Sequence, residues 1–251
     1  GVPQVRKRTL YFFWKKSEFG EKTPVLHFYN RPHQKIEDVI MNNRANFQMD
    51  PINTKTPSKD DPYYRYLLEV VHGGITHRQF FDILETDNVR GNDVESLIEK
   101  SGHDYLTVGK WMEKNGYEKE IPKCERKYEK LKAGGNIMRR GTIVPKDYIG
   151  AFVGHYPNVL THPHEDRYIT YREAMTIMGL PDNFELLDPK KSINHICQNV
   201  PFQTAFDMST EIKAVFDGER KWAGTDFFYQ SNINQSCEEW NRTESSLEQF
   251  F

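Results

Sequence analysis

The middle of the chain, residues 15–164, carries apolar residues at the three- and four-residue spacing of short amphipathic helices. Asp60-Asp61-Pro62 and Thr76-His77-Arg78-Gln79 each place capping side chains directly before an apolar run, which predicts two helix starts. Three further helices are predicted, one opening at Asn92-Asp93, one spanning 107–114, and one opening at Pro122. Glycine pairs at 73–74 and 134–135 end the first and the last of these helices. The pattern indicates a mainly helical module.

Two apolar runs of strand length follow this module. Residues 142–144 and 149–153 are rich in β-branched and aromatic side chains, and Pro145-Lys146-Asp147 between them is typical of a turn. The sequence therefore predicts two strands joined by that turn.

Two helices are predicted towards the carboxyl end of the chain. Thr170 and Glu173 form a capping box that starts a helix at Tyr171, and Gly179 ends it. The second helix is expected from Pro201 to about Phe216, because proline suits the first helical position. Its buried face is expected to contain Ala205, Met208, Ile212 and Val215.

Composition limits the class of protein. A net charge of −2 over 251 residues excludes a uniformly basic nucleic-acid binder, although residues 119–147 hold nine Lys or Arg against four acidic residues. Three cysteines at irregular spacing argue against a disulfide framework and favour a reducing compartment. The sequence has no run of 18 apolar residues and no secretory cleavage pattern, so we expect an intracellular protein without a membrane span.

The first eight residues, Gly1-Val2-Pro3-Gln4-Val5-Arg6-Lys7-Arg8, place two arginines at alternate positions ahead of an apolar strand. Alternate residues of a strand face the same side, so Arg6 and Arg8 are expected to enter one pocket. Their guanidinium groups suit phosphate oxygens and base edges. The alternative is an edge strand whose charges are solvated.

Three segments of the chain, taken in order, resemble the last three motifs of the DNA cytosine-5 methyltransferase family. The first eight residues resemble its Gly-Val-Pro-Gln-x-Arg-x-Arg motif. Residues 167–184 resemble its Arg-x-Leu-Thr-x-Arg-Glu motif and the Gly-Phe-Pro-Asp-x-Phe that follows. The third segment, Cys197-Gln198-Asn199-Val200-Pro201, resembles Gly-Asn-Ala/Ser-Val-Pro, although only its last two residues match.

The resemblance implies an α/β fold, namely part of a Rossmann-like S-adenosylmethionine methyltransferase domain. Residues 1–14 and 165–220 would supply only a completing strand and helix of that domain. Residues 15–164 would form an inserted, mainly helical target-recognition domain, and 221–251 a polar tail.

The resemblance also implies site residues. Those that stabilise an extruded target cytosine would be Gln4, Arg6 and Arg8. Those that bind the cofactor S-adenosylmethionine would be Gln198, Asn199 and Val200. The alternative for the cofactor residues is a polar loop that only caps the helix opening at Pro201.

Residues 136–155 lie in the region that reads the major groove of DNA in this family. Arginine can pair bidentately with guanine, and lysine with phosphate. The predicted DNA-binding residues are Asn136, Arg139, Arg140, Thr142 and Lys146. The alternative interpretation is a surface turn whose charges are simply solvated.

The sequence lacks the family's glycine-rich cofactor turn, its Pro-Cys nucleophile and its Glu-Asn-Val tripeptide. We therefore expect the carboxy-terminal half or subunit of a DNA cytosine-5 methyltransferase of a bacterium or a virus-infected cell. It would act on double-stranded DNA and be inactive without an amino-terminal half. The alternatives are an inactive DNA-binding module and a replication-clamp interaction protein, which would bind a sliding clamp through Leu247, Phe250 and Phe251.

The histidines of the carboxyl half raise the question of a metal site. The zinc interpretation would use His155, His162, His164 and Cys197. Their spacing fits no standard zinc pattern, so no metal is expected.

Overall fold

The chain is described from a computed structural model, in which two compact units can be recognised. The smaller unit comprises residues 1–2, 7–33 and 200–251, and the larger unit comprises residues 3–6 and 34–199. The structure describes residues 2–4, 6, 13, 15–19, 23–24, 26–28, 34–41, 55–86, 92–137, 141–145, 149–219, 222–223 and 229–231.

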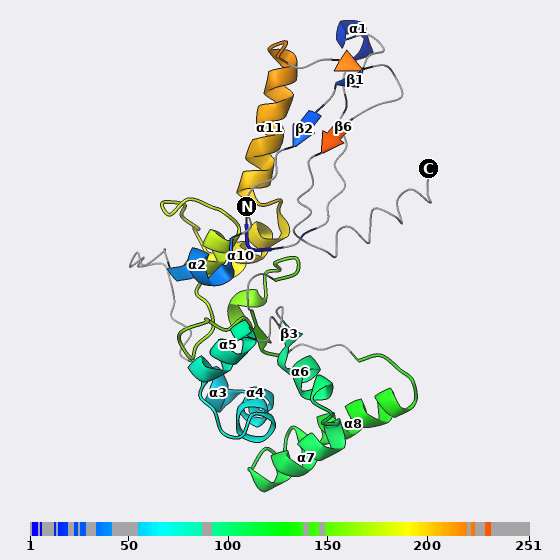
Figure 1. Cartoon of the computed structure of the whole chain (residues 1–251), viewed down its shortest axis with the longest axis vertical. Coiled ribbons are helices and arrows are strands. Elements are labelled where there is room, and N and C mark those ends of the chain that lie inside the picture. The colour runs from blue at the N-terminus through cyan, green and yellow to red at the C-terminus, as the bar shows by residue number, and fades with distance from the viewer. Residues whose placement is uncertain are drawn as a thin grey trace. The chain divides into compact units, whose positions relative to one another are not determined.

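The larger unit is built mainly of short helices (Figure 1). Its α-helices are α2 (Ile36–Met41), α3 (Pro57–Asp60), α4 (Pro62–Tyr66), α5 (His77–Thr86), α6 (Val94–Lys100), α7 (Tyr105–Lys114), α8 (Ile121–Lys132), α9 (Tyr171–Ile177) and α10 (Pro189–Gln198). A π-helical turn, η1 (Leu67–Val71), continues α4, and a 3-10 turn, η2 (Tyr156–Asn158), precedes α9. Strands β3 (Asn92–Asp93) and β4 (Ile143–Val144) pair antiparallel.

The smaller unit combines two short strand pairs with one long helix. Strands β1 (Thr23–Pro24) and β5 (Trp222–Ala223) pair antiparallel, whereas β2 (Leu26–Phe28) and β6 (Tyr229–Ser231) pair parallel. Its helices are α1 (Lys16–Phe19) and α11 (Phe202–Phe216). Figure 1 shows α11 alongside β2, against which it packs.

The predicted helix starts at Asp61, Thr76 and Asp93 are confirmed, and α8 begins at Ile121, one residue ahead of the predicted Pro122. The Asp61 carboxylate accepts the backbone N–H of Tyr63 at 2.9 Å, and the Asp93 carboxylate accepts that of Ser96 at 2.9 Å. Thr76 and Gln79 exchange the two bonds of a capping box. Helix α7 begins at Tyr105, two residues ahead of the expected start at residue 107, because Asp104 caps it.

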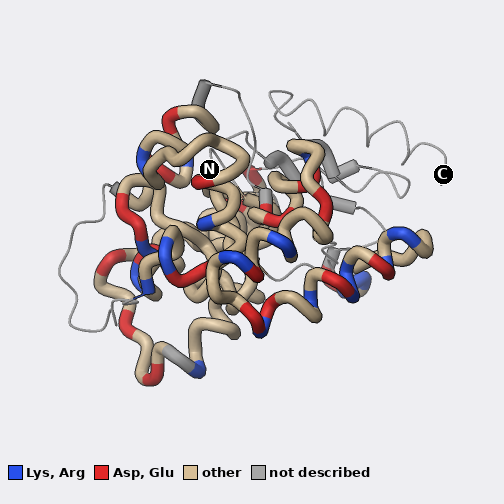
Figure 2. The backbone as a smooth tube through the Cα atoms, turned by 90° about the horizontal axis from the view of Figure 1, so that it is seen from below, with Lys and Arg blue, Asp and Glu red and all other residues tan. Residues whose placement is uncertain are grey.

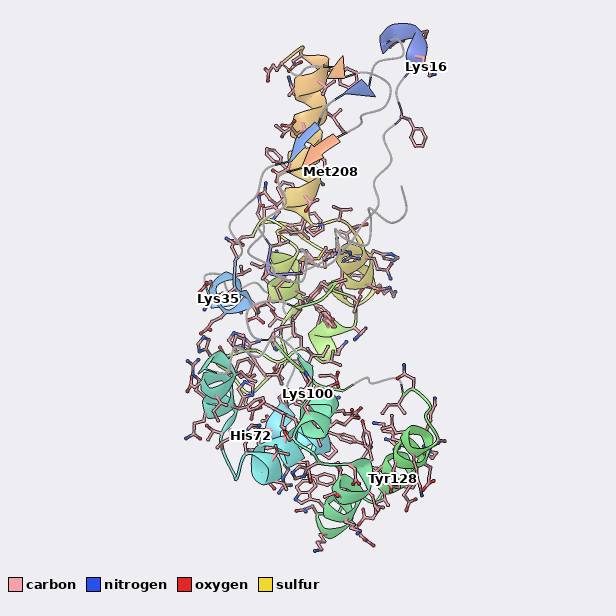
Figure 3. All side chains as sticks on the ribbon, turned by 45° about the vertical axis from the view of Figure 1, so that its right-hand side comes forward. Lys16, Lys35, His72, Lys100, Tyr128 and Met208 are labelled. Carbon is pink, nitrogen blue, oxygen red and sulfur yellow. The ribbon has the colours of Figure 1, made fainter. Side chains whose placement is uncertain are left out.

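Two hydrophobic cores hold the larger unit together. One, the helical core, is formed by the helices from α4 through α8 together with β4. Its buried residues include Tyr64, Phe80 and Met112. Tyr128, labelled on α8 in Figure 3, packs against it and is half-buried. The other, the carboxy-terminal core, joins α2, α9 and α10 and includes Ile177.

The prediction of a second strand over residues 149–153 is wrong. Only Ile149 forms a bridge, parallel to Gln4, and the remaining residues are irregular. The backbone N–H of Phe152 donates to the Gln4 side chain and its carbonyl accepts from Arg6. Side chains therefore satisfy the polar backbone groups that a strand partner would otherwise satisfy.

The carboxyl end differs from the prediction in two respects. Residues 189–198 form α10, whose start is capped by the Asp188 carboxylate. The interpretation of a polar loop ahead of Pro201 is therefore wrong for Gln198, which is helical. Helix α11 begins at Phe202, close to the predicted start, but its burial differs from the prediction. Val215 is buried, Met208 (labelled in Figure 3) and Ile212 are half-buried, and Ala205 is exposed. The buried residues of α11 are Glu211, Ala214 and Val215.

Candidate functional site

Gln4 connects the amino-terminal segment to α9. Its side-chain amide donates to the Ile177 carbonyl at 3.4 Å and contacts the Met178 sulfur at 3.1 Å. Its side-chain oxygen accepts the Phe152 N–H at 3.2 Å, and the residue is 8% exposed. Gln4 therefore holds the end of α9 and the irregular segment around Phe152 in one place.

Arg6 connects the same segment to α10. One terminal nitrogen of its guanidinium group donates to the carbonyls of Phe152 at 2.9 Å and Cys197 at 2.5 Å, and the other donates to the Gln198 carbonyl at 2.7 Å. The last carbonyls of a helix lack intrahelical partners and carry partial negative charge. Arg6 therefore caps the carboxyl end of α10.

These contacts bring together parts of the three segments singled out in the sequence. Gln4 and Arg6 come from the first, Ile177 and Met178 from the second, and Cys197 and Gln198 from the third. The pairs are between 173 and 192 positions apart in the sequence. Arg8 lies outside the described residues, so the shared pocket for two arginines stays a prediction.

A glycine lets the Phe152 segment approach α10 closely. A Cβ atom added at Gly154 would lie 2.2 Å from the Asn194 side-chain oxygen and 2.5 Å from the Asn194 Cα. Both distances are far below normal van der Waals contact, and one of them is to backbone. Only glycine fits here without a shift of α10.

The charged residues of the second segment are engaged in its own fold. The Arg167 guanidinium binds Glu173 bidentately at 2.9 and 2.7 Å, and its Nε donates to Glu165 at 2.7 Å. Burial lowers the pKa of Arg167, but the bonds to Glu173 and Glu165 outweigh it and raise that pKa above its usual range. Glu173 also accepts the Thr170 N–H at 2.8 Å, which completes the predicted capping box of α9. Its buried carboxylate therefore joins the start of α9 to Arg167.

Arg172 fixes the turn after α9. Its guanidinium donates to the Phe184 carbonyl at 2.6 Å, and the Phe184 N–H donates to the Pro181 carbonyl at 3.0 Å. Arg172 is 3% exposed. The Pro-Asp-Asn-Phe end of the second segment is therefore held against the body of α9.

Two buried histidines link the helical core to the carboxy-terminal core. Nε2 of His77 lies 2.7 Å from the His162 carbonyl and Nδ1 lies 2.7 Å from the Tyr64 hydroxyl, so Nε2 carries the proton and donates. Nδ1 of His162 accepts the N–H groups of His164 and Glu165, both at 3.1 Å. Burial is the main cause that lowers the pKa of both rings. Among the residues that the structure describes, no group of three or more His, Cys, Asp or Glu could hold a metal ion.

The expected DNA-binding residues fall into three groups. Asn136 is exposed, whereas Arg139, Arg140 and Lys146 lie outside the described residues. Thr142 is 2% exposed and its hydroxyl bonds Asp61 and Tyr168, so this side chain supports the segment and does not face solvent. Figure 2 shows both signs of charge interspersed along the described backbone, which agrees with the low net charge.

A cleft of about 460 Å³ opens beside Gly141, the residue that follows the two arginines. Its wall contains both lysines and carboxylates, and two of the lysines are paired with carboxylates of the wall. The lining residues are Lys55, Asp60, Asp61, Pro62, Tyr63, Glu95, Glu120, Lys123, Lys127, Gly141 and Tyr168.

The expected cofactor residues lie at and just after the carboxyl end of α10. The side chains of Gln198 and Asn199 are exposed, and Val200 is half-buried. The Gln198 amide donates to the Asn194 side chain at 3.3 Å while its carbonyl accepts from Arg6. Exposed amide groups can donate to a carboxylate and accept from an ammonium group, which are the polar groups of an amino-acid ligand. The donor and acceptor set therefore fits the methionine end of S-adenosylmethionine.

Sequence reasoning missed three features of this region. It did not predict α10, although Asp188-Pro189 has the residue types of an N-cap and a first helical position. It also missed the close approach of Gly154 to α10 and the link between His77 and His162, which join positions far apart in the sequence. The expected clamp-binding residues Leu247, Phe250 and Phe251 lie outside the described residues, and their role stays a prediction.

Comparison with protein-family models gives a match over most of the chain. The model of a protein family described as C-5 cytosine-specific DNA methylase matches residues 1–214, the greater part of the chain. No curated protein and no solved structure matches the chain significantly. None of the helices in the described part of the chain is long and apolar enough to cross a membrane.

Proposed function

The chain belongs to the C-5 cytosine-specific DNA methylase family, and we propose on this premise that it is the carboxy-terminal part of a DNA cytosine-5 methyltransferase. The family has the S-adenosylmethionine methyltransferase fold, methylates cytosine in DNA and takes the methyl group from S-adenosylmethionine. The proposal adds that this part needs an amino-terminal part for activity.

The cluster formed by Gln4 and Arg6 with α9 and α10 is the observation that carries the proposal. It joins the residues that resemble three motifs of one family, although they are far apart in the sequence. Arg6 is held by three backbone carbonyls and acts as a brace. The side-chain amide of Gln4 is likewise bound at both ends, because its nitrogen donates to Ile177 and its oxygen accepts from Phe152. We assign contact with the extruded cytosine to Arg8, which follows this braced segment, because an arginine can donate two bonds to base or phosphate oxygens.

The nucleophile is proposed to come from outside the given sequence. The family uses a cysteine thiolate that adds to carbon 6 of the cytosine ring and so activates carbon 5. Burial raises the pKa of Cys197 to about 12, and Cys124 is also buried with a raised pKa. Thiols in such surroundings are poor nucleophiles. The sequence has no Pro-Cys pair at Cys237 either.

The cofactor is proposed to lie beside the end of α10. Gln198 and Asn199 would bind the methionine end of S-adenosylmethionine through their amide groups, and Val200 would contact it through its apolar side chain. S-adenosylmethionine supplies the methyl group when it is bound. The contribution of Arg6 is to fix the carbonyls of α10 so that the two amide side chains keep their direction.

DNA reading is proposed for the segment around Gly141. Asn136, Arg139, Arg140 and Lys146 would contact bases and phosphates of double-stranded DNA. Thr142 would hold the segment in place from inside the unit.

A complementation assay tests the proposal. The chain is incubated with cytosine-containing duplex DNA and radiolabelled S-adenosylmethionine, alone and together with a separately expressed amino-terminal half of a family member. Methyl transfer that needs both parts supports the proposal. Binding of DNA without transfer under any complementation would instead make the chain a DNA-binding module. The chain with Arg6→Ala lacks the brace between the amino-terminal segment and α10, and it is expected to complement poorly.

A further inference from the structure

Three polar side chains form one hydrogen-bonded row inside the larger unit. The Thr142 hydroxyl lies 2.8 Å from the Tyr168 hydroxyl and also binds the Asp61 carboxylate. A carboxylate can only accept, so the single hydroxyl hydrogen of Thr142 points to Asp61. Tyr168 then donates to Thr142. The direction of both bonds is thereby fixed.

Two members of the row are buried, whereas Asp61 is partly exposed and lines the cleft beside Gly141. Thr142 is 2% exposed and Tyr168 is 7% exposed. The other oxygen of Asp61 accepts the N–H groups of Tyr63 at 2.9 Å and Tyr64 at 3.3 Å and so caps α4. Tyr168 belongs to the second segment, just ahead of the capping box of α9. Thr142 is therefore tied to α4 on one side and to the start of α9 on the other.

The backbone around Thr142 is held as firmly as its side chain. Its carbonyl accepts the Val94 N–H at 2.9 Å. The next residue, Ile143, donates to the Val159 carbonyl at 2.7 Å and accepts from the Thr161 N–H at 2.9 Å. Both edges of this short strand are therefore paired, one with β3 and one with the segment after η2.

The proposed DNA-reading residues flank this anchored strand in the sequence. Arg139 and Arg140 come just before Thr142, and Lys146 comes just after the strand. The chain runs from Arg140 through Gly141 directly to Thr142, so a displaced anchor would move the point at which this segment joins the strand. Phosphate contacts depend on charge and tolerate small shifts, whereas a bidentate contact with a base edge depends on geometry.

We infer that Asp61, Thr142 and Tyr168 are positioning residues that set the base selectivity of the DNA-reading segment and contribute little to its affinity for DNA in general. The inference rests on the proposed function, in which residues 136–146 read DNA. It assigns selectivity to side chains that touch no base.

Substitutions at Thr142 test this inference. Thr142→Val keeps the shape but removes the hydroxyl, and Thr142→Ser keeps the hydroxyl. Each purified chain is used to select duplexes from a random-sequence library, and its affinity for unselected duplex DNA is measured separately. The ratio of the affinity for the best selected sequences to the affinity for unselected DNA measures base selectivity. We expect Thr142→Val to lower this ratio by about tenfold, which is the effect of losing one base contact. Its affinity for unselected DNA is expected to change less than about twofold, because the phosphate contacts remain. Thr142→Ser is expected to match the unmodified chain.

The outcomes separate the inference from the function on which it rests. A folded Thr142→Val chain that keeps the base preferences of a selective unmodified chain overturns the positioning role only. An unmodified chain that selects no sequence overturns both the positioning role and the proposed DNA reading. If the thermal unfolding of Thr142→Val shows that it does not fold, Tyr168→Phe takes its place, because it removes one bond of the row and leaves Thr142 bound to Asp61. Tyr168→Phe is expected to weaken the base preferences in the same direction.

Discussion

The guanidinium group of Arg6 donates a 2.5 Å hydrogen bond to the main-chain oxygen of Cys197, a residue 191 positions further along the chain. The same group binds the carbonyls of Phe152 and Gln198. One side chain therefore closes a loop that contains most of the larger unit. Because loop closure is costly in conformational entropy, such a contact stabilises the folded chain only if its bonds are strong, and bonds from a charged donor are the strong kind.

Arg6→Ala is expected to lower the free energy of unfolding by about 3 kcal/mol, because hydrogen bonds from a charged group contribute roughly 1.5–3 kcal/mol each and several are lost together. Urea unfolding followed by circular dichroism measures this change. Arg6→Lys is the matched control, since it keeps the charge but lacks the fork that reaches several carbonyls at once. It is expected to lose about half as much stability. An Arg6→Ala chain as stable as the unmodified one would contradict the bracing role.

Gly154→Ala is expected to destabilise the chain by about 1–3 kcal/mol, because the new methyl group would overlap the backbone of Asn194 and force α10 to move. Gly150→Ala is the control in the same segment, since an added Cβ there meets no atom within 4 Å. Thermal unfolding of the two variants should separate them by several degrees. Equal melting temperatures would show that α10 shifts freely.

Local patterns could be predicted from the sequence, and distant contacts could not. The Thr170–Glu173 capping box and the Asp61 cap are encoded within four residues, so the spacing alone predicts them. The strand predicted at 149–153 failed because the Phe152 backbone is bound by Gln4 and Arg6, which stand about 150 positions earlier. Nothing in the apolar pattern of that run carries this information. The Gly154 contact with Asn194 could not be predicted for the same reason. In the sequence alone, a glycine that allows a helix to approach closely looks the same as a glycine in a turn.

Stability is expected to fall as the pH decreases below about 6.5, the ordinary pKa of histidine, because His77 and His162 have lowered pKa values in the folded chain. In this range the unfolded chain binds more protons than the folded chain, so protonation favours unfolding. Above pH 6.5 both histidines are neutral in the folded and the unfolded chain, and the free energy of unfolding is at its highest. As the pH falls from 6.5 towards the pKa of each histidine in the folded chain, the free energy of unfolding decreases. The charged groups that act on the pair are Asp166 and Arg78 for His77, and Glu173, Arg167 and Glu165 for His162.

Urea unfolding at a series of pH values between 5 and 8 measures this dependence. His77→Gln can still donate to the His162 carbonyl but cannot be protonated, so its stability should decline less over the same range. A decline as steep as that of the unmodified chain would assign the effect to other groups.

The two carboxylates bound to Arg167 are expected to differ in their contribution. Glu173→Gln should cost about 2 kcal/mol, because it removes a bidentate ion pair with a mostly buried partner. Glu165→Gln should cost less than about 1 kcal/mol, because the Glu165 side chain is 61% exposed and its ion pair is screened by water. Denaturant unfolding of both variants compares them directly. A larger loss for Glu165→Gln would contradict the stronger contribution assigned to the Arg167–Glu173 ion pair.

Cys124 and Cys197 are expected to resist alkylation in the folded chain. Both side chains are buried, burial raises the pKa of both thiols, and that of Cys197 reaches about 12. Because the thiolate is the reactive form, iodoacetamide at pH 8 should leave both unmodified until urea unfolds the chain. Peptide mapping by mass spectrometry measures the extent of modification at each cysteine before and after unfolding. Rapid modification of Cys197 in the folded chain would show that the end of α10 opens to solvent, and the bracing of its carbonyls by Arg6 would then have to be transient.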